Sequence, residues 1–474
     1  TNDILKLLIA DEDLEVEGPV ISKGMKILTV TKRLKATFCP ICGSKMHSKG
    51  IYTRTVNHPV LQDGTQLDQT APAQIEVHRA SVRAYIKDSF SFVDPKRRNT
   101  NLADIFIVFA FKDPALSAAQ IAKRFSVSDT YAINLFARYV DMPRRQIPEV
   151  LCVDKVCVNV SRVCKYALVL QDFETGEPVD ILANRRQEIT EPYFSSIPAG
   201  ERAKVRYLVS DMYKPYINYI DKYFPNAISI VDAFHVIKMI NDKLMAYIEG
   251  SKAIKESWIE SHEELEQKLG RHVDFTSSKE YFLLKNYKWL ILKNQNNIKY
   301  PGKSFCSYKL RRYVNTSQIE KMLFDIDPNL KDLRDLKEKY ITFNKRFGGN
   351  YKAAKPELRK LIALYRESPY QVFHEVADTL TYHFESIVNS FIMVERLCCD
   401  GIHLSRLSNG PVESLNHIAK DIKRNGHGYR NFEHLRNRFL FSQRKNASVL
   451  AVPKSLDEVV PDTGIKRGPY KKHE

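Results

Sequence analysis

The feature that most constrains the fold of this chain is a run of five short apolar segments between residues 150 and 231. Each segment is rich in β-branched and other apolar residues, as buried strands are. The five segments cover residues 150–160, 164–171, 178–184, 204–210 and 227–231. Helical patterns at 188–197 and 214–223 separate the later segments. Three strands in succession, followed by alternating helices and strands, predict an α/β domain with a mixed sheet.

Beyond this region the chain changes to long, charged segments with helical periodicity, from about residue 235 to 400. The clearest helical stretches are 235–270, 317–346, 353–367 and 370–399. Because this block carries no catalytic motif of its own, we predict a helical insertion in the sheet domain. The sheet domain resumes at 409–416, where an Asn-Gly-Pro sequence is a strong signal for the start of a helix.

The amino-terminal residues, up to about 95, are typical of a small β-rich module, with strands expected at 26–33 and 74–86. Between these strands lies a Cys-x-x-Cys turn formed by Cys39 and Cys42. Two thiolates at this spacing can bind one tetrahedral zinc ion, but no second cysteine pair follows. The module therefore either folds with two reduced structural cysteines or completes a zinc site with histidine. The histidine candidates are His47, His58 and His78.

Residues 116–130 have the pattern of a helix-turn-helix motif. A short turn at 126–128 ends with Ser128, which can cap a second helix running from Asp129 to about Tyr139. That second helix would present its early polar residues to a DNA groove, and a purely structural helical hairpin is the alternative. The apolar face of the first helix consists of Ala118, Ile121, Ala122 and Phe125.

The charge of the chain is strongly basic, with 73 Lys and Arg against 56 Asp and Glu, a formal net charge of +17. Such a balance is typical of nucleic-acid binding. The alternative is a basic enzyme whose function has no relation to nucleic acids. Basic residues also gather after residue 413, where a solvated basic face is the alternative to DNA contact. The candidate DNA-binding residues are Lys123, Arg124, Ser128 and Thr130 in the helix-turn-helix, and Lys420, Lys423, Arg424 and Arg430 near the carboxyl end.

Features of membrane or secreted proteins are not expected. The sequence has no apolar run of the roughly 18 residues needed to span a bilayer, and no signal segment at its start. Its eight cysteines are scattered rather than spaced as a disulfide framework, which favours a reducing cytoplasm.

Three acidic residues stand where a sheet-based active site would place them. Asp154 lies in the first strand, Asp211 ends the fourth, and Glu413 falls in the first turn of the helix at 409–416. Two divalent ions held by such carboxylates can activate a nucleophile and stabilise the leaving oxygen in phosphodiester chemistry. Magnesium prefers these hard oxygen ligands. Taken singly, an acid at a strand end is more often a turn or cap residue.

Several motifs in a fixed order make the chain resemble the bacterial insertion-sequence transposases of the ISL3 family. The resemblance covers about residues 30 to 445, and its most specific parts are the last two motifs. The motifs are residues 39–43, 116–130, 153–155, 209–212, 232–236, 408–416 and 422–432.

The resemblance implies an RNase H-like catalytic domain of the DDE type with a helical insertion. It implies Asp154, Asp211 and Glu413 as the three catalytic acids, holding two Mg²⁺ or Mn²⁺ ions. Asp232 and His235 resemble an acid-x-x-His signature and are second-tier site residues; the alternative is that Asp232 caps a helix and His235 packs. The family's second Cys pair would fall near 85–92, where this chain has none, so zinc at Cys39 and Cys42 is left open.

We therefore expect a multidomain α+β chain that acts as a DNA transposase. It would bind terminal inverted repeats, cleave and join strands with bound metal, and act as a homodimer on double-stranded DNA in the bacterial cytoplasm, associated with the nucleoid. A domesticated, non-cutting repressor and a nuclease without strand transfer are the alternatives. The expected parts are 1–95 (β-rich, zinc-finger-like module), 96–148 (helix-turn-helix and linker), 149–234 (catalytic, first part), 235–400 (helical insertion), 401–450 (catalytic, second part) and 451–474 (basic flexible tail).

Overall fold

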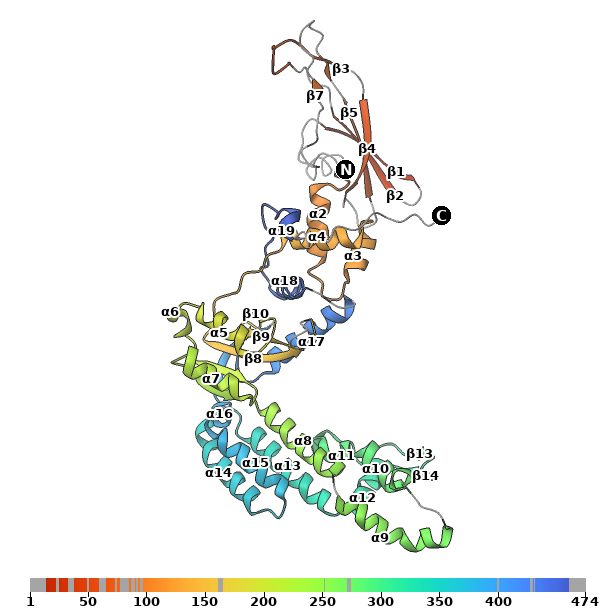
Figure 1. The fold of residues 1–474 in the computed structure, drawn as a ribbon, viewed down its shortest axis with the longest axis vertical. Coiled ribbons are helices and arrows are strands. Elements are labelled where there is room, and N and C mark those ends of the chain that lie inside the picture. Colours follow the sequence, from red (N-terminus) through yellow and green to blue (C-terminus); the bar gives the residue numbers. More distant parts are fainter. Residues whose placement is uncertain are drawn as a thin grey trace. The chain divides into compact units, whose positions relative to one another are not determined.

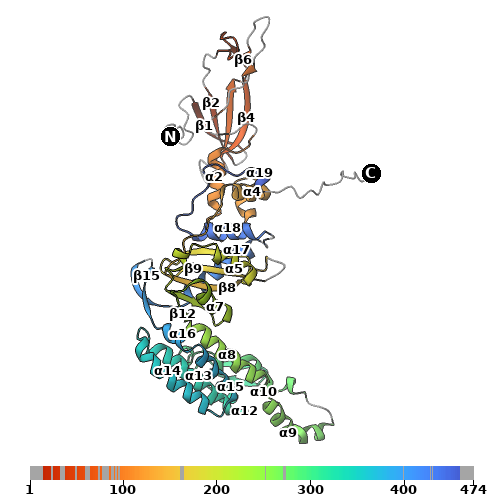
Figure 2. The same ribbon diagram turned by 60° about the vertical axis from the view of Figure 1, so that its left-hand side comes forward.

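The computed structural model divides the chain into two compact units (Figures 1 and 2). The central unit contains residues 145–155 and 168–416, and the terminal unit contains 1–144, 156–167 and 417–474. The residues that the structure describes are 14–22, 25–32, 38–48, 51–58, 65–72, 75–76, 85–86, 90, 93, 97–160, 165–250, 252–270, 274–398, 400–426, 429 and 431–459.

A five-stranded mixed sheet organises the chain between residues 150 and 231, as the sequence predicts (Figure 1). Its strand order is β10-β9-β8-β11-β12. The first three strands run antiparallel, whereas β11 is parallel to both β8 and β12. The strands are β8 (Val150–Cys157), β9 (Tyr166–Asp172), β10 (Pro178–Leu182), β11 (Tyr207–Ser210) and β12 (Ile228–Val231).

One face of this sheet packs against the helices that connect its strands. Leu151 and Val153 of β8 lie in this core together with Phe194 and Tyr216 from two of those helices. Because successive side chains of a strand point to opposite faces, Asp154 is directed to the other face of the sheet. The connecting helices are α5 (Gln187–Ser195), α6 (Ala199–Arg202) and α7 (Lys214–Tyr223).

The chain between residues 233 and 389 is mostly helical and has its own large core. In Figures 1 and 2 the helices α8, α13, α14 and α15 lie side by side, and α13 contacts both α8 and α14. The segment also contains two 3₁₀ turns (Phe275–Ser277 and Gln295–Asn297) and a short hairpin of β13 (Phe305–Ser307) and β14 (Arg312–Val314). Its helices are α8 (Ala233–Gly250), α9 (Lys252–Leu269), α10 (Lys279–Tyr287), α11 (Trp289–Leu292), α12 (Thr316–Ile326), α13 (Asn329–Arg346), α14 (Tyr351–Glu367), α15 (Gln371–Tyr382) and α16 (Phe384–Asn389).

The helix predicted over 370–399 is wrong in its last part, where the chain forms a strand instead. Strand β15 (Met393–Cys398) pairs antiparallel with β16 (Gly401–Arg406). Exposure alternates along β15 with a period of two, because every second side chain faces solvent. Cross-strand pairing with β16 therefore overrides the helical character of the local sequence.

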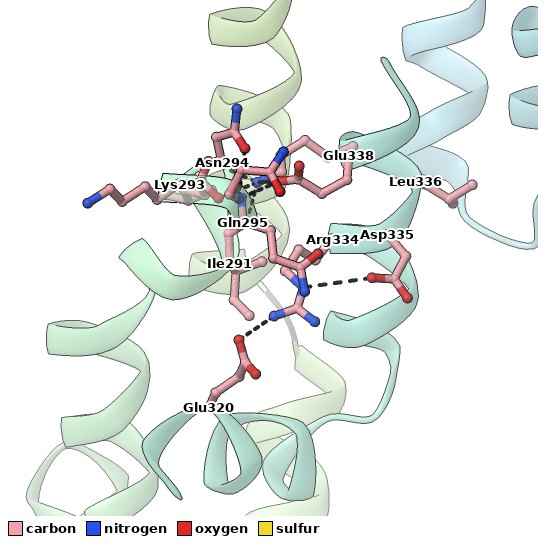
Figure 3. A network of polar contacts seen from close by, with 12 residues as sticks. Ile291, Lys293, Asn294, Gln295, Glu320, Arg334, Asp335, Leu336 and Glu338 are labelled. Carbon is pink, nitrogen blue, oxygen red and sulfur yellow. Dashed lines mark hydrogen bonds and ion pairs between the residues drawn. The ribbon is translucent and has the colours of Figure 1, made fainter. Parts of the chain in front are cut away.

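Buried cations brace the core of the helical segment. The ammonium group of Lys337 has 0% exposure and donates to the carbonyl oxygens of Ile291, Leu292 and Lys293 at 2.8, 3.0 and 2.8 Å. These carbonyls end α11, where helix geometry leaves acceptors without intrahelical partners. One turn earlier on α13, Arg334 lies between Glu320 and Asp335 (Figure 3).

The amino-terminal part of the terminal unit is β-rich, as predicted. Its main sheet has the order β1-β2-β5-β4, and a smaller one has the order β3-β6-β7. The prediction of a single strand over 74–86 is wrong, because Ile75 of one strand pairs antiparallel with Ile86 of another. The strands are β1 (Leu14–Ser22), β2 (Met25–Lys32), β3 (His47–Ser48), β4 (Ile51–His58), β5 (Thr65–Pro72), β6 (Ile75–Glu76) and β7 (Tyr85–Ile86).

Helices α3 and α4 of the same unit lie where the sequence predicts them, separated by a turn at 126–128. Ser117 forms a capping box with Gln120 at the start of α3, and the Ser128 hydroxyl caps α4 by accepting the backbone N–H of Tyr131. Further helices are α2 (Asn101–Ala110), α3 (Ala118–Arg124), α4 (Asp129–Tyr139), α17 (Gly410–Asn425), α18 (Phe432–Gln443) and α19 (Leu456–Val459). None of the described helices combines the length and the apolar character that crossing a membrane requires.

Candidate active site

Three buried aspartates lie at the same level on three neighbouring parallel strands. Val209 of β11 pairs with Cys152 of β8 and with Ile230 of β12. Two residues further along each strand direction stand Asp154, Asp211 and Asp232. Since equivalent positions on parallel strands share one face of the sheet, the three carboxylates converge at its edge. Their exposed fractions are 6%, 5% and 5%, respectively.

Two helices add a histidine and a glutamate to this edge. His235 lies in the first turn of α8, directly after β12, and Glu413 lies in the first turn of α17. One donor atom each of Asp232, His235 and Glu413 can be chosen so that all three lie within 4.8 Å of one another. Among the described residues, Asp232, His235 and Glu413 are the group of three or more His, Cys, Asp or Glu side chains whose ligand atoms lie close enough together to hold a metal ion.

The carboxylates of Asp154 and Asp211 are held by donors from the protein itself. The Lys155 ammonium donates to Asp211 Oδ2 at 2.8 Å, and the backbone N–H of Tyr213 donates to Asp211 Oδ1 at 2.9 Å. The Lys155 backbone N–H donates to Asp154 Oδ1 at 2.8 Å, while the Asn416 amide donates to Asp154 Oδ2 at 2.8 Å. Each of the four oxygens thus accepts a hydrogen bond.

Burial makes the charged forms of these carboxylates costly. It raises the pKa of Asp154, and the neighbouring Asp211 charge raises it further against the opposing effects of the Lys155 backbone N–H, His235 and the Lys155 charge. Burial also raises the pKa of Asp232, although His235 and backbone N–H groups favour its charged form. Negative groups that are costly to ionise in this way are stabilised by a nearby cation.

Polar atoms in this region also lack partners. His235 Nε2 is buried without a hydrogen-bond partner, and so is Asn416 Oδ1, among the described residues. The side chain of Asn409 is fully buried, and neither its oxygen nor its nitrogen has a partner. Buried polar atoms are nearly always satisfied in folded proteins, so these atoms are available to a ligand.

The structure brings together the predicted acids Asp154 and Asp211 through their shared neighbour Lys155, and it groups Glu413 with the second-tier residues Asp232 and His235. Asp232 also accepts the backbone N–H of Phe234, so the capping role considered for it is present as well.

Sequence reasoning missed Lys155 and Asn416 as members of this cluster. Asn416 follows Glu413 by three residues, a spacing that places both on one helical face, so helical periodicity could have found it. Lys155 gave no such signal, because neighbouring residues of a strand alternate between faces. Its long, flexible side chain nevertheless reaches Asp211.

The predicted DNA-binding residues occur on exposed or half-buried parts of helices in the terminal unit. Lys123, Arg124, Ser128 and Thr130 are exposed around the turn between α3 and α4. Ser128 uses its hydroxyl as a helix cap. On α17, Lys420 and Arg424 are exposed, Lys423 is half-buried, and Arg424 forms an ion pair with Asp421 at 2.8 Å. Arg430 lies outside the described residues.

The candidate zinc site is incomplete in the part of the chain that is described. Cys39 is buried and Cys42 is half-buried, with the turn closed by the Gly43 N–H donating to the Cys39 carbonyl at 2.8 Å. No third ligand joins the two cysteines among the described residues. His58 instead lies 3.0 Å from the Thr100 hydroxyl, and burial lowers its pKa to about 4. His47 is exposed, and His78 lies outside the described residues.

Comparison with known proteins identifies the family of the chain. A family model described as a transposase, of the DDE type and ISL3 family, matches residues 151–439, which is more than half of the chain. No curated protein gives a significant match. The matched range includes the sheet, the helical segment and all five acidic and histidine side chains of the cluster. The chain therefore belongs to the ISL3 family of DDE transposases.

Proposed function

We propose that this transposase binds the terminal inverted repeats of an insertion sequence and cleaves and joins DNA strands at the cluster of Asp154, Asp211 and Glu413. The observation that carries the proposal is the placement of Asp154, Asp211 and Asp232 at one level on three adjacent parallel strands. A point where several buried carboxylates converge suits phosphoryl-transfer chemistry better than it suits fold stability, because their mutual repulsion is costly.

The topology supports an RNase H-like catalytic domain. Three antiparallel strands, β8 to β10, are followed by the parallel strands β11 and β12. The helical segment follows β12 directly and would be an insertion, after which α17 supplies the third acid. We also propose the division of the chain into the six parts expected from the sequence, from the amino-terminal module to the basic tail.

The side chains of the cluster fit the expected pair of Mg²⁺ or Mn²⁺ ions. Carboxylate oxygens are the preferred ligands of both ions, and the unpartnered His235 Nε2 suits Mn²⁺ better than Mg²⁺. When bound, such ions activate a water or a 3′-hydroxyl and neutralise charge on the leaving oxygen. Asp154, Asp211 and Glu413 would hold them, with Asp232 and His235 in support.

The other residues of the cluster orient these ligands. The Asn416 amide fixes one oxygen of Asp154, and the Tyr213 backbone N–H fixes one oxygen of Asp211. Partners of this kind hold metal ligands in a productive orientation. Asn416 also links α17, which bears Glu413, to strand β8.

Recognition of DNA ends is assigned to α3 and α4. Lys123 and Arg124 would neutralise phosphates, while Thr130 stands early on the helix that would enter the groove. Lys420, Lys423, Arg424 and Arg430 would add phosphate contacts. Pairing of two element ends favours a homodimer on DNA, and a protein with this substrate would act at the bacterial nucleoid.

The proposal is tested by strand cleavage of a duplex that carries the element end, with Mg²⁺ present. Asp154→Asn, Asp211→Asn and Glu413→Gln should each abolish cleavage while end binding persists. Asp221→Asn is a matched control, because Asp221 is an exposed aspartate on α7. Retained cleavage in any of the three variants removes that residue from the site.

Two other outcomes would change the function itself. Specific end binding by the wild-type protein without cleavage in Mg²⁺ or Mn²⁺ would indicate a repressor. Cleavage that gives no joined product with a target duplex would indicate a nuclease.

A further inference from the structure

Lys155 places a positive charge inside the cluster where the proposed function requires a metal ion. Its ammonium nitrogen lies 2.8 Å from Asp211 Oδ2. The Asp211 side chain is 8% exposed, whereas the Lys155 side chain is 37% exposed and so has an open path to solvent. A lysine ammonium is a compact point charge on a flexible stem, which can leave such a contact without moving the backbone.

The other hydrogen bonds to Asp211 and Asp154 come from donors that are fixed in the fold. Asp211 Oδ1 accepts the Tyr213 N–H, a backbone contact that fixes the turn after β11. The neighbouring Asp154 uses both oxygens for the Lys155 N–H and the Asn416 amide. Of these four donors, the Lys155 ammonium is the one that carries a charge and ends a long side chain.

We propose that Lys155 is a place-holding cation that occupies the metal position at Asp211 until a divalent ion displaces it. The inference rests on the proposed function, since it concerns the metal that the transposase uses. The ammonium compensates Asp211 while the site has no ion, and it competes with the ion for the same oxygen. A buried carboxylate without any partner would be costly, which gives the lysine a reason to be there.

The test measures the Mn²⁺ affinity of the full-length protein without DNA. Isothermal titration calorimetry and the electron paramagnetic resonance signal of free Mn²⁺ each give this affinity. Lys155→Met should bind Mn²⁺ about three- to tenfold more tightly, as expected for loss of a competing ion pair that is partly exposed. Lys155→Arg keeps the charge and should stay near the wild-type affinity. Lys222→Met is the matched control, because it removes a lysine from the surface ion pair with Glu191.

A second readout does not depend on the absolute affinity. Mn²⁺ should raise the melting temperature of Lys155→Met more than that of the wild-type protein, because at one concentration a ligand that binds the folded state more tightly stabilises it more. Circular dichroism of Lys155→Met with saturating Mn²⁺ verifies that it folds, and Lys155→Gln serves as a second neutral variant.

The outcomes separate the two proposals. Unchanged or weaker Mn²⁺ binding in both neutral variants overturns the role of Lys155. If Asp211→Asn loses Mn²⁺ binding in the same experiment, Asp211 is still a metal ligand and the proposed function stands. Absence of Mn²⁺ binding in the wild type and in every Lys155 variant overturns both. Binding by the neutral variants alone supports the competition.

Discussion

Replacing Lys337 by methionine should loosen the end of α11 in the helical segment. Methionine has a similar length and keeps the apolar stem but removes the ammonium group. Three carbonyl oxygens, those of Ile291, Leu292 and Lys293, then lose a donor that lies 2.8–3.0 Å away. The ion pair with Glu338 at 2.9 Å is lost as well.

The magnitude follows from opposing effects. A buried acceptor left without a partner costs roughly 1–3 kcal/mol, so three of them give a large gross loss. Removal of a desolvated charge offsets part of it, and the cost of that desolvation is evident because burial lowers the pKa of Lys337. We expect a net loss of about 3 kcal/mol, which is roughly a hundredfold in the local opening equilibrium.

Hydrogen–deuterium exchange of the full-length protein measures this loss locally. A single free energy of unfolding is poorly defined for a chain with two compact units, whereas amide exchange reports the opening of each segment. Peptides that cover residues 289–297 should exchange about a hundredfold faster in Lys337→Met.

The control is Lys339→Met, since Lys339 is exposed on the same helix, α13. Wild-type exchange rates in Lys337→Met would refute the reasoning, because the three carbonyls would then not depend on the ammonium. An equal loss of protection in Lys339→Met would refute it too, because any lysine of α13 would then have the same effect.

Three further predictions concern other parts of the chain. Burial lowers the pKa of His58 to about 4 in the folded state, against 6.5 for the unfolded chain, so its contribution to stability of about 3 kcal/mol is fully present above pH 6.5 and is lost as the pH falls toward 4. His58→Gln should make the melting temperature of the terminal unit depend less on pH in this range. An unchanged pH dependence of the melting temperature would contradict this role of His58. Asn416→Ala removes the amide group that donates to Asp154, and it should lower Mn²⁺ affinity or the cleavage rate about 10–100-fold with end binding intact. Wild-type Mn²⁺ affinity and cleavage in this variant would show that the contact does not orient Asp154. Ser128→Ala removes the cap on the Tyr131 N–H and should cost about 1 kcal/mol of α4 stability, measured by amide exchange, whereas Ser128→Asp should retain it.

Local sequence signals were sufficient where the structure depends on neighbours along the chain. The alternation and apolar character of residues 150–231 predicted all five strands of the sheet to within a few residues. The start of α4 at Asp129 followed from the capping side chain of Ser128. Glu413 was placed in the first turn of a helix by its Asn-Gly-Pro lead-in, and α17 begins at Gly410. Periodicity and capping are short-range, so they can be read from sequence.

Sequence signals failed where pairing with a distant segment decided the outcome. Met393–Cys398 is a strand because β16 is beside it, and Ile75 and Ile86 belong to two strands because they pair with each other. In both cases the local pattern did not specify its partner, and the hydrogen bonds of a strand always lie on another segment.

The carboxylates were therefore identifiable from sequence as residue types in plausible positions, and family resemblance assigned their roles. Only the tertiary structure decided that Asp154, Asp211 and Asp232 share one level, because strand register sets it. It also decided that Lys155 reaches Asp211 and that Asn416 bonds to Asp154 across 262 positions of sequence. Such contacts depend on which strands are neighbours and how far a side chain extends, and no local pattern encodes either.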